Sequence, residues 1–409
     1  MFDAYKIRKD FPILEKKIEG KRNTYLDTAA SAQKPLCVID AMMDVYLNEY
    51  ANVHRGSYYL SEKITNRYEG ARKLIKNFIN ASSDREIIFT RNATEGINLV
   101  ASCFGMDNLK AGDEILLSTA EHHANLVTWQ QCAKKTGATL TYFDLDENGE
   151  FVWENFTNKL TSKTKIVAVT AMSNVLGTIF PIKDICKEAH NFGAKVLIDA
   201  CQFIVHDKVD VLDIDCDFLV FSGHKLYGPT GIGVLYAKYD ILEKMSPYQF
   251  GGDMIEHVYY DKTIFGLPSQ KFEAGTPAIV QTIGLGEAIK YLNNFDINDI
   301  KKYEEELTKY TTLKLQEVDG LKIVGNAKNK GGVFSFDING IHPQDLAFVL
   351  GKEGIGVRTG HFCAEPLVNK LGYNSLTRAS LGIYSVKEDI DILIETLYKA
   401  KKFFIWEVT

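Results

Sequence analysis

The sequence of 409 residues predicts an α/β fold: a large domain with a mostly parallel central sheet, then a smaller α+β C-terminal domain. From about residue 85, short apolar segments alternate with helix-like segments, which is typical of a sheet covered by helices on both faces. After about residue 290 this alternation stops, and long helical segments and short strands follow. The change of pattern indicates two domains.

The predicted strands of the large domain are almost continuous apolar runs. Such runs are expected where both faces of a parallel sheet are buried. The strands are residues 86–90, 114–118, 165–170, 195–199 and 217–221. The clearest helical segments between them are EGINLVASCF (95–104) and IKDICKEAHNF (182–192).

The C-terminal part predicts one or two long helices over about 283–317, with Lys, Glu and Asn on one face. Short strands near KIVG, GVFSFDI and TRASLGI and helices at 343–352 and 387–405 follow. We therefore predict three regions: an N-terminal arm (1–24) that packs with the small domain, a large domain (25–290) and a small domain (291–409).

Composition excludes several classes of function. A net charge of −6 and a pI near 5.9 predict neither a nucleic-acid nor an anionic-membrane partner. No apolar run approaches the roughly 20 residues of a membrane span, and the N-terminal segment has no secretory pattern. Seven cysteines without C-x-x-C spacing suit a reducing cytoplasm and predict no metal site. We interpret all of them except Cys363 as small core residues.

Polar residues follow several predicted strands, where open α/β sheets bind their ligands. Thr94 and the amides of Glu95 and Gly96 open a helix after the first strand, a position that favours a phosphate, although a plain helix cap explains it too. His122 and His123 follow the second strand. Neighbouring side chains point in different directions, so we expect at most one of these histidines to face a given ligand.

A carboxylate lies at the end of one further predicted strand, and a lysine follows another. Asp199 closes a very apolar strand, where an unpaired carboxylate is costly. It either caps the next element or pairs with a cation such as a pyridinium nitrogen. Ser222, His224 and Lys225 lie in a glycine-rich bend after strand 217–221. A partly desolvated lysine amine is what a Schiff base requires. The glycines of this bend match neither the G-x-G-x-x-G spacing nor the Walker spacing of nucleotide-binding motifs.

Ordered motifs extend over nearly the whole chain. Together they resemble the class V aminotransferase family of fold-type-I pyridoxal-phosphate (PLP) transferases, and within it the Suf-type cysteine desulfurases. The motifs are YLDTAA (25–30), NVHRGSYYLS (52–61), TRNATEGINLVA (90–101), EHHANLVTW (121–129), SNVLGT (173–178), DACQ (199–202), DFLVFSGHKLYGPTGIGVLY (217–236), FEAGTP (272–277), RTGHFCAEPL (358–367) and RASLGIY (378–384).

The resemblance implies a role for each matching residue. Lys225 would bind PLP covalently, Asp199 would pair with the pyridinium nitrogen, and His122 would stack on the ring. The other implied cofactor ligands are Gln202 at the ring oxygen and, toward the phosphate, Thr94, Glu95, Ser222, His224 and, across a homodimer interface, Thr276. The implied substrate-binding residues are Asn174 and Arg378, whose guanidinium suits a carboxylate, with Arg358 and His54.

Cys363 decides which member of the family the sequence resembles. It lies in a predicted loop beside Arg358 and His361, basic neighbours that favour a thiolate. The loop resembles the R-x-G-H-H-C-A motif of Suf-type desulfurases, whose cysteine accepts the sulfur. Phe362 replaces the usual second histidine, so no proton transfer is expected there. Thr128 likewise replaces a usual proline.

The resemblance implies a cysteine desulfurase that converts L-cysteine to L-alanine. It would leave a persulfide on Cys363 for a small Suf acceptor protein in iron–sulfur cluster assembly. A selenocysteine lyase, a sulfinate lyase or a transaminase on the same fold remains as an alternative. A catalytically silent scaffold subunit is disfavoured because Lys225, Asp199 and Cys363 are all present. Metal-dependent hydrolysis is disfavoured because no H-E-x-x-H spacing occurs.

Overall fold

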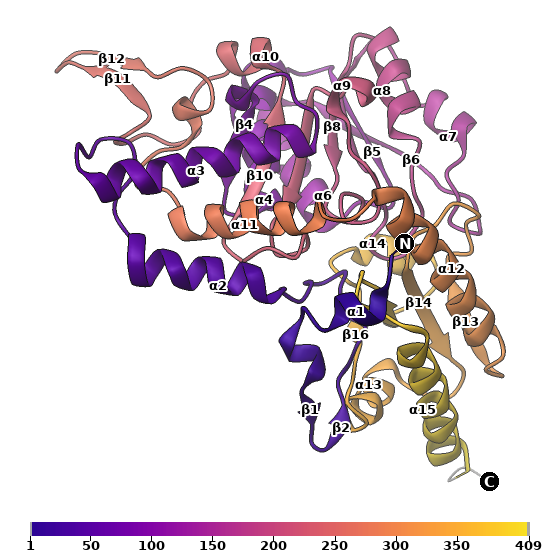
Figure 1. Ribbon diagram of the computed structural model, residues 1–409. Coiled ribbons are helices and arrows are strands. Elements are labelled where there is room, and N and C mark those ends of the chain that lie inside the picture. Colours follow the sequence, from indigo (N-terminus) through magenta and orange to yellow (C-terminus); the bar gives the residue numbers. More distant parts are fainter. Residues whose placement is uncertain (1, 407–409) are drawn as a thin grey trace.

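A seven-stranded sheet forms the centre of the larger part of the molecule (Figure 1). In the computed structural model, which describes residues 2–406, its order is β4-β10-β9-β8-β7-β5-β6. Only β10 runs antiparallel to its neighbours. The predicted α/β fold is confirmed. The strands are β4 (Ile87–Thr90), β5 (Glu114–Ser118), β6 (Thr139–Phe143), β7 (Thr164–Thr170), β8 (Lys195–Asp199), β9 (Phe218–Ser222) and β10 (Gly233–Ala237).

Helices cover both faces of this sheet, and strand residues alternate between two apolar cores. Ile87 and Phe89 belong to one core, whereas Ile88 belongs to the other. The first core includes residues of α3 (Tyr59–Phe78), α7 (Trp153–Thr157), α8 (Ile182–Asn191), α9 (Val211–Ile214) and α11 (Ile279–Leu292), and α11 also contacts α2 (Leu36–Asp44). The second includes residues of α4 (Ala93–Val100), α6 (His123–Thr136) and α10 (Tyr239–Lys244); short α5 (Met106–Asn108) lies beside α6.

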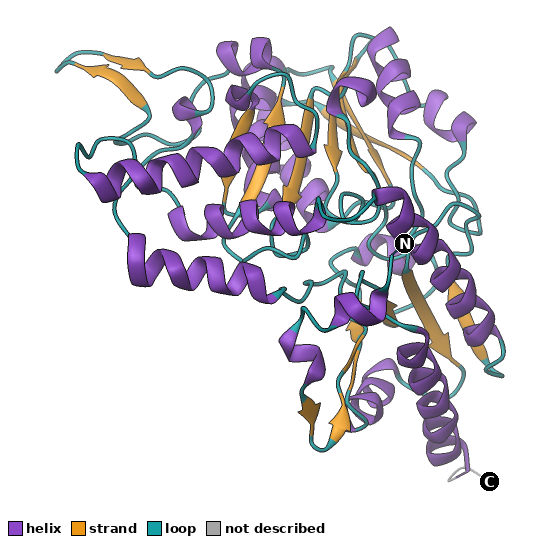
Figure 2. Ribbon diagram, viewed as in Figure 1, coloured by secondary structure: helices purple, strands orange, loops and turns teal. Residues whose placement is uncertain are grey.

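A second, antiparallel sheet of four strands has the order β13-β14-β17-β16 (Figure 2). Its apolar core is separate from the other two and includes residues of three helices. The predicted domain boundary at residue 290 lies in the last turn of α11, seven residues before the first of these helices begins. The elements are β13 (Leu321–Val324), β14 (Val333–Ile338), β16 (Arg358–Gly360), β17 (Leu376–Ser380), α12 (Ile297–Gln316), α13 (Pro343–Lys352) and α15 (Lys387–Trp406), with α14 (Glu365–Lys370) after β16.

The N-terminal segment contacts elements near the other end of the chain. Arg8 forms a buried ion pair of 2.9 Å with Asp389. β3 (Thr24–Tyr25) pairs in parallel with β15 (Ile355–Gly356). Residue 1 of the predicted arm and residues 407–409 of the predicted small domain lie outside the described residues. The other elements here are α1 (Ala4–Arg8), β1 (Lys17–Ile18) and β2 (Lys21–Arg22).

A hairpin of β11 (Ile255–Val258) and β12 (Thr263–Phe265) extends away from the large sheet, at the upper left of Figure 1. It carries exposed apolar side chains, among them Val258, Tyr260 and Ile264. Among the described residues, no helix combines the length and apolar character that crossing a bilayer demands.

One glycine brings two parts of the large sheet into close contact. A Cβ on Gly233 of β10 would lie 2.5 Å from the Cα of Asn92. Asn92 caps α4, and its side chain accepts the N–H of Glu95. Only glycine allows this approach, so Gly233 helps to place the N-terminus of α4 beside the carboxyl end of β9.

Candidate active site

A cavity of about 260 Å³ lies beyond the carboxyl ends of β7, β8 and β9. This is where ligands bind in open α/β sheets, because the loops after parallel strands converge there. The loop after β16 closes the other side. The cavity brings together most of the predicted site residues, namely Thr94, His122, Asn174, Asp199, Gln202, Ser222, His224, Lys225, Arg358, Cys363 and Arg378.

Lys225 and Asp199 enter the cavity from neighbouring strands. Lys225 is half-buried, and its N–H donates to Ser222 in a turn directly after β9. Asp199 is the last residue of β8 and is buried, and one carboxylate oxygen accepts the N–H of Cys201. Gln202 donates from its side-chain amide to the carbonyl oxygen of Ala29 at 2.7 Å. An amine and a carboxylate therefore line one partly desolvated space.

Two imidazoles in the cavity are neutral at pH 7. Burial, together with the charge of Lys225, lowers the pKa of His122 to about 4. The Nδ1 atom of His122 accepts the N–H of Ala124, so its proton is assigned to Nε2. Burial and Lys225 also lower the pKa of His224 to about 4. Both rings are therefore free to accept a proton or to contact an aromatic ligand.

An anion-binding corner lies where α4 begins. The Ser222 hydroxyl accepts the N–H of Ala93 at 2.9 Å, so its own proton remains available for another acceptor. Thr94 follows in the first turn of α4. Glu95 does not reach the cavity: its N–H is bound by Asn92, and its carboxylate pairs with Arg91 at 2.9 Å. The Glu95 N–H, which was predicted to face a phosphate, is therefore occupied by Asn92.

Arg378 enters from β17 and is 2% exposed. Its Nη1 donates to the carbonyl oxygen of Asn174 at 2.8 Å, and its Nη2 lies 3.5 Å from Asp27. Its Nε is buried and has no hydrogen-bond partner among the described residues. Burial lowers the pKa of Arg378 to about 10, so it stays charged. A buried guanidinium with an unused donor is suited to a carboxylate ligand.

Cys363 lies at the exposed rim of the same cavity. Its carbonyl oxygen accepts the N–H of His123, whose ring in turn accepts the N–H of Glu365. Of the two adjacent histidines, His122 therefore lines the cavity and His123 supports the cysteine loop. Five other cysteines are buried and Cys37 is half-buried.

Asp27 is part of the site although sequence reasoning assigned it no role. Its carboxylate pairs with Arg358 at 2.9 Å and lies 3.5 Å from Arg378, so it links two cavity arginines. Arg358 is thereby turned partly toward Asp27 and remains half exposed. Asp27 closes the apolar segment YLD, and a carboxylate at that position was the available signal.

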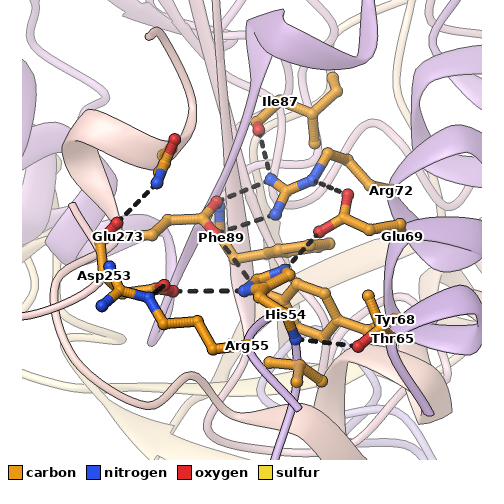
Figure 3. A network of polar contacts seen from close by, with 12 residues as sticks. His54, Arg55, Thr65, Tyr68, Glu69, Arg72, Ile87, Phe89, Asp253 and Glu273 are labelled. Atoms are coloured by element: carbon orange, nitrogen blue, oxygen red, sulfur yellow. Dashed lines mark hydrogen bonds and ion pairs between the residues drawn. The ribbon is translucent and has the colours of Figure 1, made fainter. Parts of the chain in front are cut away.

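Besides Glu95, two further predicted residues lie outside the cavity. Thr276 lines two hollows that are separate from this cavity, one together with Glu95 and the other together with Arg55. His54 lies in a chain of alternating charges (Figure 3): it bonds Asp253 at 3.3 Å and Glu69 at 3.0 Å. This chain of charges continues from Glu69 to Arg72 at 2.9 Å and from Arg72 to Glu273 at 2.7 and 2.9 Å. Among the described residues, this charge network includes none of the other predicted substrate-binding residues, Asn174, Arg358 and Arg378.

The charge of His54 predicts a pH-dependent stability. The hydrogen bonds that the His54 ring donates to the carboxylates of Asp253 and Glu69 raise the pKa of His54 to about 9, above the value near 6.5 of an unfolded chain. The stabilisation is therefore fully present below pH 6.5 and is lost as pH rises through about 9. We expect His54→Gln to lower the unfolding temperature by about 2 °C at pH 6, with the difference vanishing by pH 10.

Thermal unfolding of both proteins between pH 6 and 10 measures this difference. Arg55→Gln is the matched control, because Arg55 also approaches Asp253, at 3.9 Å, but stays charged throughout this range. A His54→Gln deficit that stays constant or grows with pH would contradict the assignment.

Known proteins were compared with this fold and cavity. Residues 24–393 match the family model described as aminotransferase class-V. The chain belongs to the aminotransferase class-V family. This class-V chain is also 49% identical to a probable cysteine desulfurase of Halalkalibacterium halodurans, over 98% of this chain and 99% of the relative. It is 47% identical to a probable cysteine desulfurase of Synechocystis, over 98% and 96% of the two chains.

Solved structures agree with the class-V membership. The cysteine desulfurase CsdA of Escherichia coli is 36% identical with a TM-score of 0.91, over 99% of this chain and 100% of that one. An apo cysteine desulfurase of Thermococcus onnurineus is 38% identical with a TM-score of 0.93, over 98% and 99%. Both similarities extend through both sheets and the cysteine loop of this class-V chain.

Proposed function

We propose that this enzyme is a PLP-dependent cysteine desulfurase, which converts L-cysteine to L-alanine and retains the sulfur as a persulfide on Cys363. One observation carries the proposal: the exposed Cys363 lines the same cavity as Lys225, Asp199 and Arg378. A nucleophilic thiol, an amine and a carboxylate receptor thus share one space. The named desulfurases among its relatives support the same reaction.

The cavity residues fit PLP. A phosphate would find several hydrogen-bond donors here. They are the O–H of the buried Ser222, the N–H groups at the start of α4 and the ring of His224. Small residues such as Ala29 and Cys201 leave room for a flat ring beside His122. Asp199 would pair with the ring nitrogen and Lys225 would hold the cofactor covalently. When bound, PLP supplies an electron sink for the Cα carbanion of an amino acid.

The chain's own residues would orient the substrate and move its protons. Arg378 would bind the carboxylate of L-cysteine through its in-plane donors, beside Asn174. The amine of Lys225 would take the Cα proton and later return it. The neutral imidazole of His122 would accept the proton of the substrate thiol. The deprotonated Cys363 then attacks the substrate sulfur.

The sulfur-transfer step balances without any other oxidant or reductant. An S–S bond forms between Cys363 and the substrate sulfur as the Cβ–S bond breaks. The electron pair of that bond stays on the carbon, which takes up a proton and leaves as the methyl group of L-alanine. The enzyme keeps one added sulfur atom as a persulfide.

One single-turnover experiment tests the function. Without reductant or acceptor, L-cysteine is expected to give one L-alanine and one Cys363 persulfide per active site, measured by amino-acid analysis and intact mass. Alanine without persulfide would overturn the proposal. Faster turnover of L-selenocysteine with no Cys363 adduct would favour a selenocysteine lyase, and failure to bind PLP would favour the scaffold subunit.

The persulfide requires an acceptor, and we place this enzyme upstream of a small sulfur-acceptor protein of the Suf type in iron–sulfur cluster assembly. Cytoplasmic location fits the seven unpaired cysteines. A homodimer would let Thr276 and His54, which lie outside their own cavity, reach that of the partner. Exposed apolar residues of α2 such as Ile39 and Met43 suit such an interface, and light scattering measures the mass.

A further inference from the structure

The backbone of the cysteine loop is in an unfavourable conformation. Phe362 and Cys363 both have positive φ, at 53° and 56°. Side chains other than glycine, asparagine and aspartate rarely adopt this left-handed region, and a bulky aromatic residue is disfavoured there. Two such residues in succession persist only where surrounding contacts hold them.

Hydrogen bonds from the large domain hold both carbonyl groups of this turn. The side-chain amide of Asn174 donates to the carbonyl oxygen of Phe362 at 2.7 Å. The backbone N–H of His123 donates to the carbonyl oxygen of Cys363 at 2.6 Å. The nucleophile's backbone is thus tied to residues that border the cofactor side of the cavity.

The Phe362 ring makes the third connection. It is 6% exposed, and the guanidinium carbon of Arg378 lies over it, 4.9 Å from the ring centroid. Arg378 donates to the carbonyl oxygen of Asn174, whose side chain binds Phe362. The three residues therefore form a closed triangle of contacts.

This arrangement occupies none of the donors of the Arg378 guanidinium with the ring. The N–H bonds of a guanidinium lie in its plane, so an aromatic ring over its face attracts the cation without occupying a donor. The buried Nε of Arg378 has no partner among the described residues. An aliphatic side chain would fill the same volume but would lack the attraction of the ring face.

We propose that Phe362 is a positioning residue that joins the carboxylate-binding guanidinium of Arg378 and the nucleophilic loop of Cys363 into one unit. The ring sets the orientation of the guanidinium, while its backbone sets the turn that presents the thiol. This inference rests on the proposed function, because it assigns the carboxylate and the thiol attack to that reaction.

Kinetics on L-cysteine give the first test. Phe362→Leu is expected to raise KM about tenfold and to lower kcat, since it removes the ring face but keeps an apolar side chain. Phe362→His is the matched variant, because it keeps a planar ring, and it should stay within about threefold of wild type. Unchanged KM and kcat in Phe362→Leu would overturn the proposal, as would equal losses in both variants.

A second readout needs no turnover. Iodoacetate carries a carboxylate and iodoacetamide does not, so the ratio of their alkylation rates at Cys363 reports guidance by Arg378. We expect this ratio to fall about fivefold in Phe362→Leu and to persist in Phe362→His. Peptide mass spectrometry separates Cys363 from the half-buried Cys37. Thermal unfolding and cofactor absorbance show that each variant is folded.

The alkylation ratio separates the two levels of the proposal. If L-cysteine gives no persulfide, the proposed function fails, while a ratio that depends on the ring still supports the positioning role. If persulfide forms normally and the ratio is the same in wild type, Phe362→Leu and Phe362→His, the positioning role fails alone.

Discussion

Replacing Lys225 by alanine is expected to reduce L-cysteine turnover by at least about 10³-fold. Lys225 is the only lysine among the described residues that line the cavity, so no other amine there can hold the cofactor or move the Cα proton. Both tasks fail together. The protein should also lose the visible absorbance of the covalently held cofactor.

Absorbance spectra after addition of PLP, with alanine production as the assay, measure this loss. Lys225→Arg is the matched control, because it keeps a positive charge but cannot bind the cofactor covalently. Both variants should be inactive. Residual activity above about a tenth of wild type in either variant would mean that Lys225 does not carry the chemistry.

Replacing Cys363 by serine should retain the cofactor spectrum but lower desulfuration of L-cysteine by at least about 10²-fold. A hydroxyl is a far weaker nucleophile toward sulfur than a thiolate at neutral pH. Asp199, Lys225 and His122 would all remain in place, so binding and Cα deprotonation should persist. Mass spectrometry should detect no persulfide at this position.

Cys201 offers a matched control in the same cavity. Its thiol is buried, and desolvation followed by the charge of Asp199 raises its pKa far above the ordinary value, so it stays protonated. Cys201→Ala should therefore form the Cys363 persulfide as the wild type does. A Cys363→Ser protein that still releases sulfide from L-cysteine at the wild-type rate would refute the nucleophile assignment.

The central strands of the sheet were predictable because their burial on both faces leaves almost continuous apolar runs, as at 165–170 and 195–199. Strand β6 was not identified, since TLTYF (139–143) is a half-exposed edge with polar residues. Strand β10 (Gly233–Ala237) was not among the predicted strands either, nor was its antiparallel direction. Direction depends on pairing with Thr90 and Ser222, and a residue pattern contains no such information.

Part of the cavity was also predictable from the apolar strands. Asp199 and Lys225 follow apolar strands, and the ends of parallel strands meet in space. By contrast, Asp27 and Arg358 are 331 positions apart in the chain, and they meet because Asp27 bridges to Ser380 of β17, the strand beside Arg358. The Phe362 ring reaches Arg378 through an unusual turn that no local pattern encodes.

The position of β10 has a consequence for the order of folding during synthesis. Among the described strands, β4 joins the large sheet only through β10, because Gly233 pairs with both Thr90 and Ser222. The apolar strand β4, which is synthesised early, therefore has no partner strand until β10 emerges from the ribosome. Because the start of α4 follows β4 and contacts Ser222, the proposed cofactor site is expected to form only after β10 has emerged.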